Sequence, residues 1–357
     1  MSLPTRLAAQ IASQGPMTIA QFMTACLHDP ADGYYATRPA LGAEGDFITA
    51  PLVSQMFGEL IGLWAVETWR GLGRPAPFRL IEAGPGDATL MIDLLRAARV
   101  DADFLAAADL WLVETSAPLQ ALQRQRLADA GADPQWAKTL ADVPAGAPMI
   151  LAANELLDCL PARQFVREPD GWSERVVGVN KAGALAFGLA RCPPGVVPEA
   201  PVPDGAVIEI SAAQAALGAD IGARLAKGGG AALLIDYGRD HFEAGDTLQA
   251  LQRHRKVDPL ASAGQADLTV HADFPAIAAA AGAEGAVSAL LTQGEFLRRL
   301  GIEARAGVLA RRHPDQAQKL ARQLERLVDA GQMGALFKAL CLYPSGQPAP
   351  PAFESPS

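Results

Sequence analysis

Arg79-Leu80-Ile81-Glu82-Ala83-Gly84-Pro85-Gly86-Asp87-Ala88-Thr89 is the stretch that decides the fold. Its apolar first half predicts a strand over Phe78–Ala83, and the residues after the glycines predict a helix over Thr89–Ala98. In an open α/β sheet, a glycine-rich turn after a strand lies at the carboxyl edge, where ligands bind. The two glycines permit a tight turn and close approach of a ligand to the backbone. The stretch therefore predicts a cofactor site on an α/β sheet.

The chemistry of the turn separates two classes of cofactor. A dinucleotide fingerprint requires Gly or Ala where Thr89 stands, and an acidic residue about 20 positions on, but Glu114 follows Gly86 by 28 positions. Glu82 would repel a pyrophosphate, whereas it suits an ammonium and a sulfonium. We therefore predict S-adenosylmethionine as the cofactor, with Glu114 accepting hydrogen bonds from its ribose. The predicted cofactor-binding residues are Glu82, Gly84, Pro85, Gly86, Asp87, Thr89, Glu114, Thr115, Ser116 and Asn154.

Strands and helices alternate on both sides of this turn. Strands separated by helices predict a Rossmann-like α/β fold, with a mostly parallel sheet and helices on both faces. The further strands are expected over Leu110–Val113, Met149–Ala153, Val207–Ile210 and Ala231–Tyr237, and the further helices over Pro118–Ala130 and Ala212–Ala226. Three short strands joined by turns predict a β insertion at about 163–192.

The remaining regions extend this core. Residues 1–75 are expected to form a helical and lid region, in which Ser54–Trp69 is an apolar helix of the core. The core spans 76–343, and a helical lobe is added at about 239–330. The Pro- and Ser-rich residues 344–357 are expected to be a disordered tail.

The third strand leads into Asn154-Glu155-Leu156-Leu157-Asp158, beside the expected position of the transferred methyl. The i, i+3 spacing of Glu155 and Asp158 would place both carboxylates on one face of a helical turn. Two carboxylates can orient a guanidinium and offset its charge, so we predict a catalytic role for both. The alternative is structural, with Asp158 capping a helix and Glu155 pairing with a nearby arginine.

Composition excludes several other classes. The formal net charge of −9 and a pI near 5.1 argue against a nucleic-acid binder. No window is long and apolar enough for a membrane span. The four cysteines lie far apart without a C-x-x-C pair, which argues against structural zinc and a disulfide framework, and no metal is expected. We expect a cytoplasmic protein.

Longer motifs resemble one family. They are His28-Asp29-Pro30, Gly33-Tyr34-Tyr35, Gly45-Asp46-Phe47-Ile48-Thr49-Ala50-Pro51, Ser54-Gln55-Met56-Phe57-Gly58-Glu59, Glu82-Ala83-Gly84-Pro85-Gly86, Asn154-Glu155-Leu156-Leu157-Asp158, Leu234-Ile235-Asp236-Tyr237-Gly238 and Asp267-Leu268-Thr269-Val270-His271-Ala272-Asp273-Phe274. Together they resemble the mitochondrial and bacterial protein arginine methyltransferases that act in assembly of respiratory complex I, the NADH–quinone oxidoreductase.

The resemblance implies ω-nitrogen methylation of an arginine on a complex I subunit, and the mitochondrial matrix for eukaryotic relatives. It makes the loop around Asp46 and Thr49 a lid over cofactor and arginine, with a surface Ω-loop as the structural alternative, and it adds Asp46 to the catalytic residues. Leu52 stands where the family pattern leads us to expect an acidic residue. The absence of a transit peptide fits a bacterial member.

Several alternatives stay open. A small-molecule methyltransferase and a catalytically silent assembly factor are the competing functions. Tyr34 and Tyr35 would either stack on a ligand or pack internally, and His271 would be either a base or a structural residue. The sequence does not give the target arginine, the number of methyl groups or the oligomeric state, a homodimer included.

Overall fold

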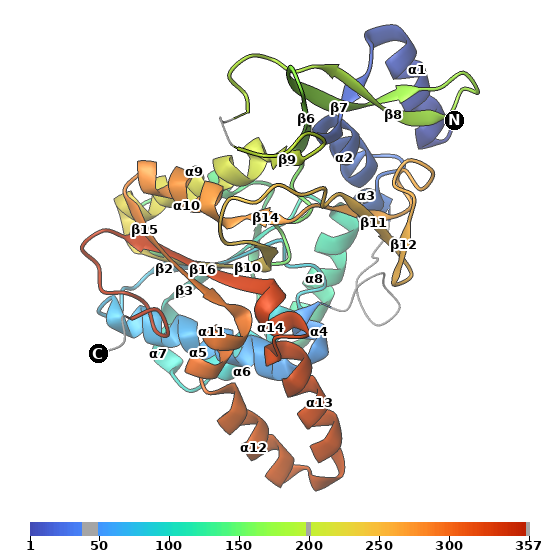
Figure 1. The fold of residues 1–357 in the computed structure, drawn as a ribbon. Helices are drawn as coiled ribbons and strands as arrows, with labels where there is room; N and C mark the ends of the chain where they lie inside the picture. Colours follow the sequence, from blue (N-terminus) through green and yellow to red (C-terminus); the bar gives the residue numbers. More distant parts are fainter. Residues whose placement is uncertain (38–48, 198–200, 355–357) are drawn as a thin grey trace.

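A computed structural model describes residues 1–37, 49–197 and 201–354. Its centre is an eight-stranded sheet in the order β15-β16-β10-β5-β2-β3-β4, with β14 beside β10 (Figure 1). The strands are β2 (Phe78–Ala83), β3 (Ala108–Val113), β4 (Gln135–Ala137), β5 (Met149–Asn154), β10 (Gly230–Arg239), β14 (Ala272–Asp273), β15 (Ala286–Thr292) and β16 (Phe337–Pro344). The run from β10 to β4 is parallel, and β16 pairs antiparallel with both of its neighbours. The predicted, mostly parallel α/β sheet is confirmed.

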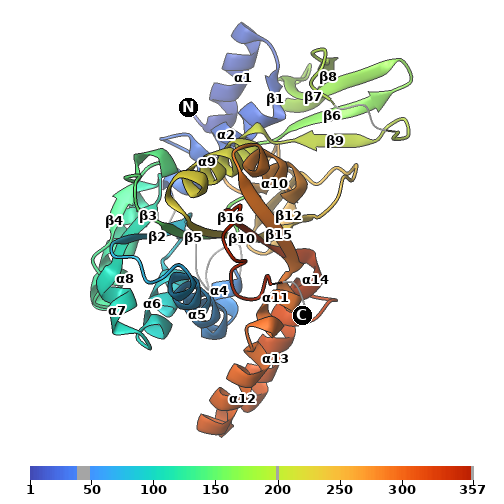
Figure 2. The ribbon, with the colours of Figure 1, turned by 90° about the vertical axis from the view of Figure 1, so that its left-hand side faces the viewer.

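Helices cover both faces of this sheet, as Figure 2 shows. Successive residues of a strand point to opposite faces, so Leu80 packs on one side and Ile81 on the other. One layer contains α5 (Gln55–Gly71), α6 (Thr89–Ala98) and α7 (Ala102–Ala107), and the opposite layer contains α9 (Ala212–Gly228) and α10 (Phe274–Ala283). The helix α8 (Ala117–Asp129) connects β3 to β4, and a 3₁₀ turn (Leu140–Asp142) follows β4.

The helix α5 lies in the core, as its apolar spacing predicted. Ser54 caps it by accepting a hydrogen bond from the Met56 backbone N–H at 3.3 Å. Trp64 and Trp69 are buried almost completely. Burial of side chains of this size dominates the stability of a core, so α5 is integral to the domain.

A second sheet holds the predicted insertion and one strand that we expected elsewhere. It contains β1 (Met17–Thr18), β6 (Arg163–Glu168), β7 (Gly171–Val179), β8 (Leu185–Arg191) and β9 (Val207–Ile210), all antiparallel. The sequence placed β9 in the alternation of the central sheet, and that was wrong. An apolar strand shows that it will be buried but not which sheet it joins, and β9 pairs with β6.

The N-terminal helices pack against this second sheet. These helices are α1 (Leu3–Gln14) and α2 (Ile19–His28), and two short helices, α3 (Tyr34–Thr37) and α4 (Ala50–Val53), follow. Thr18 and Gln21 form a capping box at the start of α2. Next to α2 lies a three-stranded sheet of β11 (Gln249–Gln252), β12 (Arg255–Val257) and β13 (Asp267–Thr269). The region expected to be a helical lobe therefore begins with strands.

The last part of the chain forms a projecting helical hairpin and then returns to the sheet. The hairpin helices α12 (Ile302–Arg312) and α13 (Ala317–Val328) follow α11 (Gln293–Arg299), with a 3₁₀ turn (Pro314–Gln316) between them, and α14 (Met333–Leu336) precedes β16. Residues 344–354, part of the expected disordered tail, pack on the domain. Phe353 is buried against Phe296, and Gln347 exchanges hydrogen bonds with the Gly230 backbone. One buried aromatic and one paired amide order a segment whose composition suggested disorder.

Candidate functional site

The candidate site lies where the strand order reverses. After β2 the chain adds β3 and β4 on one side, and then returns to place β5 on the other side of β2. Ligands of open α/β sheets bind in the crevice at the carboxyl ends of the strands at such a point. The residues at these ends are Gly84 after β2, Glu114 after β3 and Asn154 at the end of β5. Three segments predicted to bind the cofactor therefore meet at one edge.

The glycine-rich turn needs its glycines. Gly84 and Gly86 have φ values of 67° and 52°, which L-residues with a side chain rarely adopt. A Cβ atom at Gly84 would lie 2.9 Å from the Leu156 Cδ1 atom. The Gly84 N–H donates to the Val113 carbonyl at 3.0 Å, which fixes the turn against the end of β3. The turn is thus a rigid backbone surface beside β5.

Glu114 is buried and held in one orientation. Its side chain accepts hydrogen bonds from the Ser116 N–H at 2.7 Å and from the Gln123 Nε2 at 3.2 Å. The same Gln123 Nε2 donates to the Gly86 carbonyl at 2.8 Å. Burial raises the pKa of Glu114, while these hydrogen bonds oppose the rise. The arrangement ties the predicted ribose acceptor to the glycine turn, so Glu114 is not an exposed strand-end acid.

Two buried polar atoms at this edge have no hydrogen-bond partner in the described part of the chain. Among the described residues, the Glu82 Oε2 and Asn154 Oδ1 atoms are buried without hydrogen bonds. Glu82 follows Leu80 by two positions and Asn154 follows Ala152 by two, so both side chains point to the α5/α6 face. Burial, followed by the charge of Asp87, raises the pKa of Glu82 well above its ordinary value. Unsatisfied buried acceptors are costly, and a ligand carrying donors would satisfy them.

The remaining predicted cofactor residues have structural partners. Asp87 pairs with Arg126 of α8 and accepts from the Thr89 N–H at 3.0 Å. Ser116 caps α8, and its Oγ donates to the Tyr35 carbonyl at 2.7 Å. Thr115 is exposed beside them. The side chains of Asp87 and Thr89 therefore fix α6 to α8.

Glu155 sits on a strained backbone and is held from the opposite side of the site. Its φ is 53°, a conformation that costs free energy in a non-glycine residue and is concentrated at functional sites. The Glu155 Oε1 accepts from the Ala50 N–H of α4 at 2.8 Å and from the Asn154 Nδ2 at 2.9 Å. Among the described residues no group donates to the Oε2 atom. Burial raises the pKa of Glu155 to about 7.

Asp158 belongs to a buried acidic cluster with β10. Its Oδ2 accepts a hydrogen bond from the Tyr237 hydroxyl at 2.7 Å. The Asp236 Oδ2 accepts from the N–H groups of Leu157 and Asp158 at 2.8 and 3.1 Å. Burial raises the pKa of Asp158 to about 6. Asp236 therefore fixes the turn that carries Asp158, and Tyr237 fixes its carboxylate.

The segment after β5 differs from the expectation in two ways. Residues 155–160 form bends and turns, with no helix, so Glu155 and Asp158 do not share a helical face. Their structural alternative, a helix cap and an arginine ion pair, is also absent from the part of the chain described. The sequence missed Tyr237 and Asp236 as partners of Asp158. The polar pair within a buried strand was the signal that could have identified them.

Four other residues that the sequence analysis singled out differ in their positions and contacts. Asp46 lies outside the described residues. Tyr34 is buried with its ring edge against Tyr35, and the Tyr35 hydroxyl donates to Asp267 at 2.9 Å. His271 packs edge-on against Tyr237 with 5.6 Å between ring centroids, and burial lowers its pKa. Both tyrosines thus have internal contacts, and His271 touches the residue that holds Asp158.

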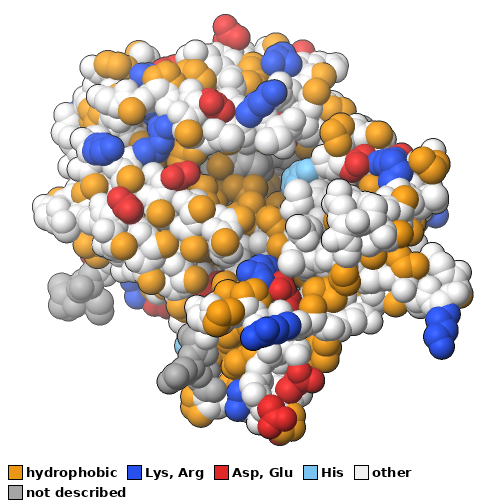
Figure 3. Space-filling model, turned by 90° about the horizontal axis from the view of Figure 1, so that it is seen from above, with side chains coloured by type: hydrophobic (Ala, Val, Ile, Leu, Met, Phe, Trp, Pro, Cys, Tyr) orange, Lys and Arg blue, Asp and Glu red, His pale blue; other side chains and the backbone are white. Residues whose placement is uncertain are grey.

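Other kinds of site find no support in the described ranges. No group of three or more His, Cys, Asp or Glu side chains there could hold a metal ion. No helix in those ranges has the length and apolar character needed to cross a bilayer. On the face in Figure 3, basic and acidic side chains are scattered around a hollow bordered by hydrophobic groups. This face has no basic patch of the kind that binds nucleic acid.

Comparisons with known proteins agree with this geometry. Residues 60–292 match a family model described as a putative S-adenosyl-L-methionine-dependent methyltransferase. The chain is 35% identical to the mitochondrial protein arginine methyltransferase NDUFAF7 homologue of Drosophila melanogaster, over 96% of this chain and 85% of the relative. It is 33% identical to the human NDUFAF7 protein, over 94% and 82%. A COG1565 superfamily structure from Burkholderia thailandensis, with bound S-adenosyl-homocysteine, is 28% identical and superposes with a TM-score of 0.86, over 98% of this chain and 94% of that one.

Proposed function

The chain belongs to the S-adenosyl-L-methionine-dependent methyltransferase family that contains the NDUFAF7 proteins, and from this premise we propose that it methylates an arginine of a protein substrate. The observation that carries the proposal is a pair of carboxylates directly after the strand that borders the cofactor edge, the half-buried Glu155 and the buried Asp158. We further propose that the substrate is a subunit of NADH–quinone oxidoreductase and that the reaction takes place in the bacterial cytoplasm. The relatives' names and the motif resemblance support the first point, and the likeness to the Burkholderia thailandensis structure supports the second.

The residues at the edge fit S-adenosylmethionine. When bound, this cofactor supplies an electrophilic methyl group on a sulfonium. The Glu82 Oε2 and Asn154 Oδ1 atoms provide acceptors for an ammonium group, and the ordered Glu114 carboxylate provides acceptors for hydroxyl groups. The turn from Gly84 to Gly86 has a positive φ at both glycines and presents bare backbone to a ligand. We assign Pro85 to the same surface, whereas Asp87, Thr89, Thr115 and Ser116 act through the backbone and through α8.

The carboxylate pair suits a guanidinium nucleophile. A guanidinium presents five N–H donors in a plane, and one oxygen of Glu155 has no donor among the residues described. Two carboxylates offset the positive charge of the arginine, which otherwise opposes attack on a sulfonium. Their pKa values of about 7 and about 6 also suit acceptance of the proton released from the methylated nitrogen. Glu155 and Asp158 therefore orient the guanidinium and take up its proton.

A transfer assay tests this proposal directly. The purified chain, labelled S-adenosylmethionine and purified subunits of NADH–quinone oxidoreductase are incubated, and mass spectrometry locates any methylarginine. We expect label on one subunit, with loss of transfer in Glu155→Gln and Asp158→Asn. Label in the small-molecule fraction alone would instead support a small-molecule methyltransferase. Cofactor binding without any turnover would support a silent assembly factor.

A further inference from the structure

The helical hairpin α12–α13 is a basic arm on an acidic protein. Residues 302–328 contain six Arg or Lys and three Asp or Glu, a formal charge of +3 in a chain whose total is −9. The hairpin projects from the domain in both ribbon views (Figures 1 and 2). Charge gathered on a projecting element is available to a partner of opposite sign.

One face of α13 is turned toward the catalytic domain. Lys319, Gln323 and Arg326 follow one another at intervals of four and three positions, which places them on one side of α13, and Gln316 immediately precedes the helix. The Gln323 Nε2 donates to the Val53 carbonyl of α4 at 2.6 Å. The two cations on this face therefore lie along α4, one on each side of Gln323.

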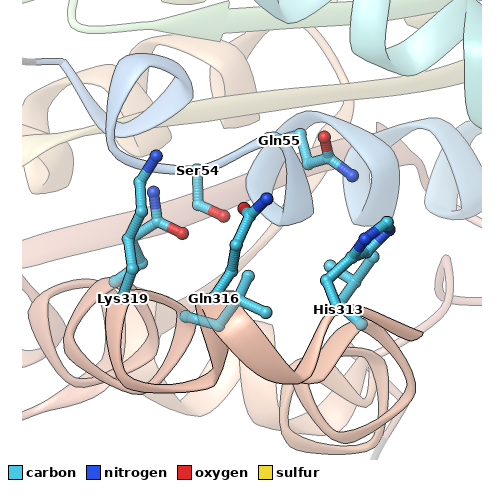
Figure 4. Close-up of a pocket in the computed structure, with 8 residues that line it drawn as sticks. Ser54, Gln55, His313, Gln316 and Lys319 are labelled. Atoms are coloured by element: carbon cyan, nitrogen blue, oxygen red, sulfur yellow. The ribbon is translucent and has the colours of Figure 1, made fainter. Parts of the chain in front are cut away.

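A pocket of about 280 Å³ opens between this face and the junction of α4 and α5. Its lining contains no Asp or Glu; it consists of Ser54, Gln55, Leu309, His313, Gln316, Lys319, Leu320 and Gln323. Figure 4 shows Lys319, Gln316 and His313 pointing across the gap toward Ser54 and Gln55. Within the described part of the chain, no acidic group pairs with Lys319. The pocket thus offers one unpaired cation among several hydrogen-bond donors.

The other end of this face reaches the carboxylate site. The positive charge of Arg326 acts on Glu155 and opposes the rise in its pKa. Glu155 is also held by Ala50, at the start of the same α4 helix that receives Gln323. Seven residues of helix span about 10 Å. An extended peptide covers that distance in about three residues.

We propose that this pocket and α13 face bind a carboxylate side chain of the protein substrate, roughly three to five residues from the acceptor arginine. The inference rests on the proposed function, because it takes Glu155 as the position of the guanidinium. A lysine ammonium surrounded by amide and hydroxyl donors recognises a carboxylate through charge-assisted hydrogen bonds. The pocket would therefore select acidic sequences around the target arginine.

Peptide binding tests the inference without requiring turnover. Three fluorescent peptides each contain one central arginine, and they differ in carrying Glu, Gln or Lys four residues to each side of it. Fluorescence anisotropy gives their affinities for the full chain in the presence of S-adenosyl-homocysteine. We expect the Glu peptide to bind about tenfold more tightly than the Gln peptide, with the preference weakened by salt. Lys319→Glu is expected to reverse the order in favour of the Lys peptide. Lys181→Glu makes the same charge change on the exposed β7–β8 turn and should leave the order unchanged.

The outcomes separate this inference from the proposed function. Equal affinities of the three peptides, no measurable binding, or the same behaviour of Lys319→Glu and Lys181→Glu would overturn the pocket assignment. Lys319→Ala, with its thermal unfolding measured, guards against misfolding and should abolish the preference without reversing it. Peptides that bind with acid preference but are not methylated when S-adenosylmethionine is supplied would contradict the proposed function and leave the pocket standing. Methylation without a charge preference would contradict the pocket assignment and leave the proposed function standing.

Discussion

The cofactor turn and the carboxylate pair lie at neighbouring strand ends, but they are assembled in different ways. The turn is held by contacts between close segments, with 37 positions separating Gln123 from Gly86 and nine separating it from Glu114. The carboxylates are held from afar: Ala50 is 105 positions from Glu155, and Tyr237 is 79 positions from Asp158. One half of the site is therefore a local motif, and the other half exists only in the complete fold.

The two halves also differ in how they tolerate change. The turn depends on missing side chains and backbone hydrogen bonds, so an added atom should damage it severely. The carboxylate half depends on burial and on hydroxyl and amide donors, so its substitutions should alter proton affinity and rate and leave cofactor binding intact. Substitutions in the two halves should therefore differ in the size of their effects on cofactor binding and on methyl transfer.

The largest effect is expected from Gly84→Val. The turn would hold valine at a positive φ, and the new Cβ would lie 2.9 Å from Leu156. Cofactor affinity should therefore fall by about 100-fold or more. Isothermal titration with S-adenosylmethionine measures the change. Gly146→Val shares the positive φ but has no atom within 4 Å of the new Cβ, and it should bind normally. Normal binding by Gly84→Val would remove the turn from the cofactor site.

Asp158→Asn is expected to produce the largest effect in the other half. Methyl transfer should fall by about 100-fold, because the variant can neither balance the guanidinium charge nor accept a proton. Cofactor affinity should change by less than about twofold, since the substitution leaves the residues assigned to the cofactor unchanged. Single-turnover transfer and titration provide the two values, with Asp170→Asn on the exposed β6–β7 turn as control. A parallel loss of cofactor binding would show that the two halves are not separable.

Glu155→Gln should increase stability while it reduces transfer. Burial raises the pKa of Glu155 from 4.5 to about 7, so the folded protein binds this proton more tightly than the unfolded chain. Stability from this group is complete below pH 4.5 and is lost as the pH rises through 7. Glutamine cannot ionise, so we expect a gain of roughly 1–3 kcal/mol in unfolding free energy at pH 8 and little change at pH 4. Denaturant titration at both pH values measures the unfolding free energy of the variant and of the parent chain. A difference between them that is the same at pH 4 and pH 8 would refute the prediction.

The difference between local and long-range contacts also decides which parts of the site could be predicted from the sequence. The turn at Gly84, the cap at Ser116 and the acid at Glu114 were predictable, because each is marked by a short stretch of sequence at the end of its own strand. The partnership of Asp158 with Tyr237 was not predictable, because it depends on which strands become neighbours. The strand β9 was misplaced for the same reason, since its apolar pattern fits either sheet. The order of residues 344–354 likewise comes from tertiary contacts of Phe353 and Gln347.

Tyr237→Phe is expected to have a smaller, pH-dependent effect. The variant loses the 2.7 Å hydrogen bond to Asp158. That bond lowers the pKa of Asp158 against the rise caused by burial, so its removal should raise the pKa further. For a rise of one unit, the ionised fraction of Asp158 at pH 6, and with it the transfer rate, should fall about fivefold, and transfer should recover by pH 9. Tyr343→Phe on β16 is the matched control, and an unchanged pH profile in Tyr237→Phe would give Tyr237 a packing role only.

Gln123→Leu should have the smallest effect, and it tests whether the turn needs its link to Glu114. Gln123 is fully buried and donates to both the Gly86 carbonyl and the Glu114 carboxylate. Without it the backbone turn remains, but Glu114 keeps only its backbone donors, so we expect cofactor affinity to weaken by about fivefold. The rate at saturating cofactor should stay unchanged, because Glu155 and Asp158 have other supports. Gln120→Leu, which removes a bond to the Glu114 carbonyl and an exposed bond from Arg124 but leaves the Glu114 carboxylate with its partners, should match the parent chain. A fall in the saturated rate of Gln123→Leu would mean that the local half of the site also controls the carboxylate half.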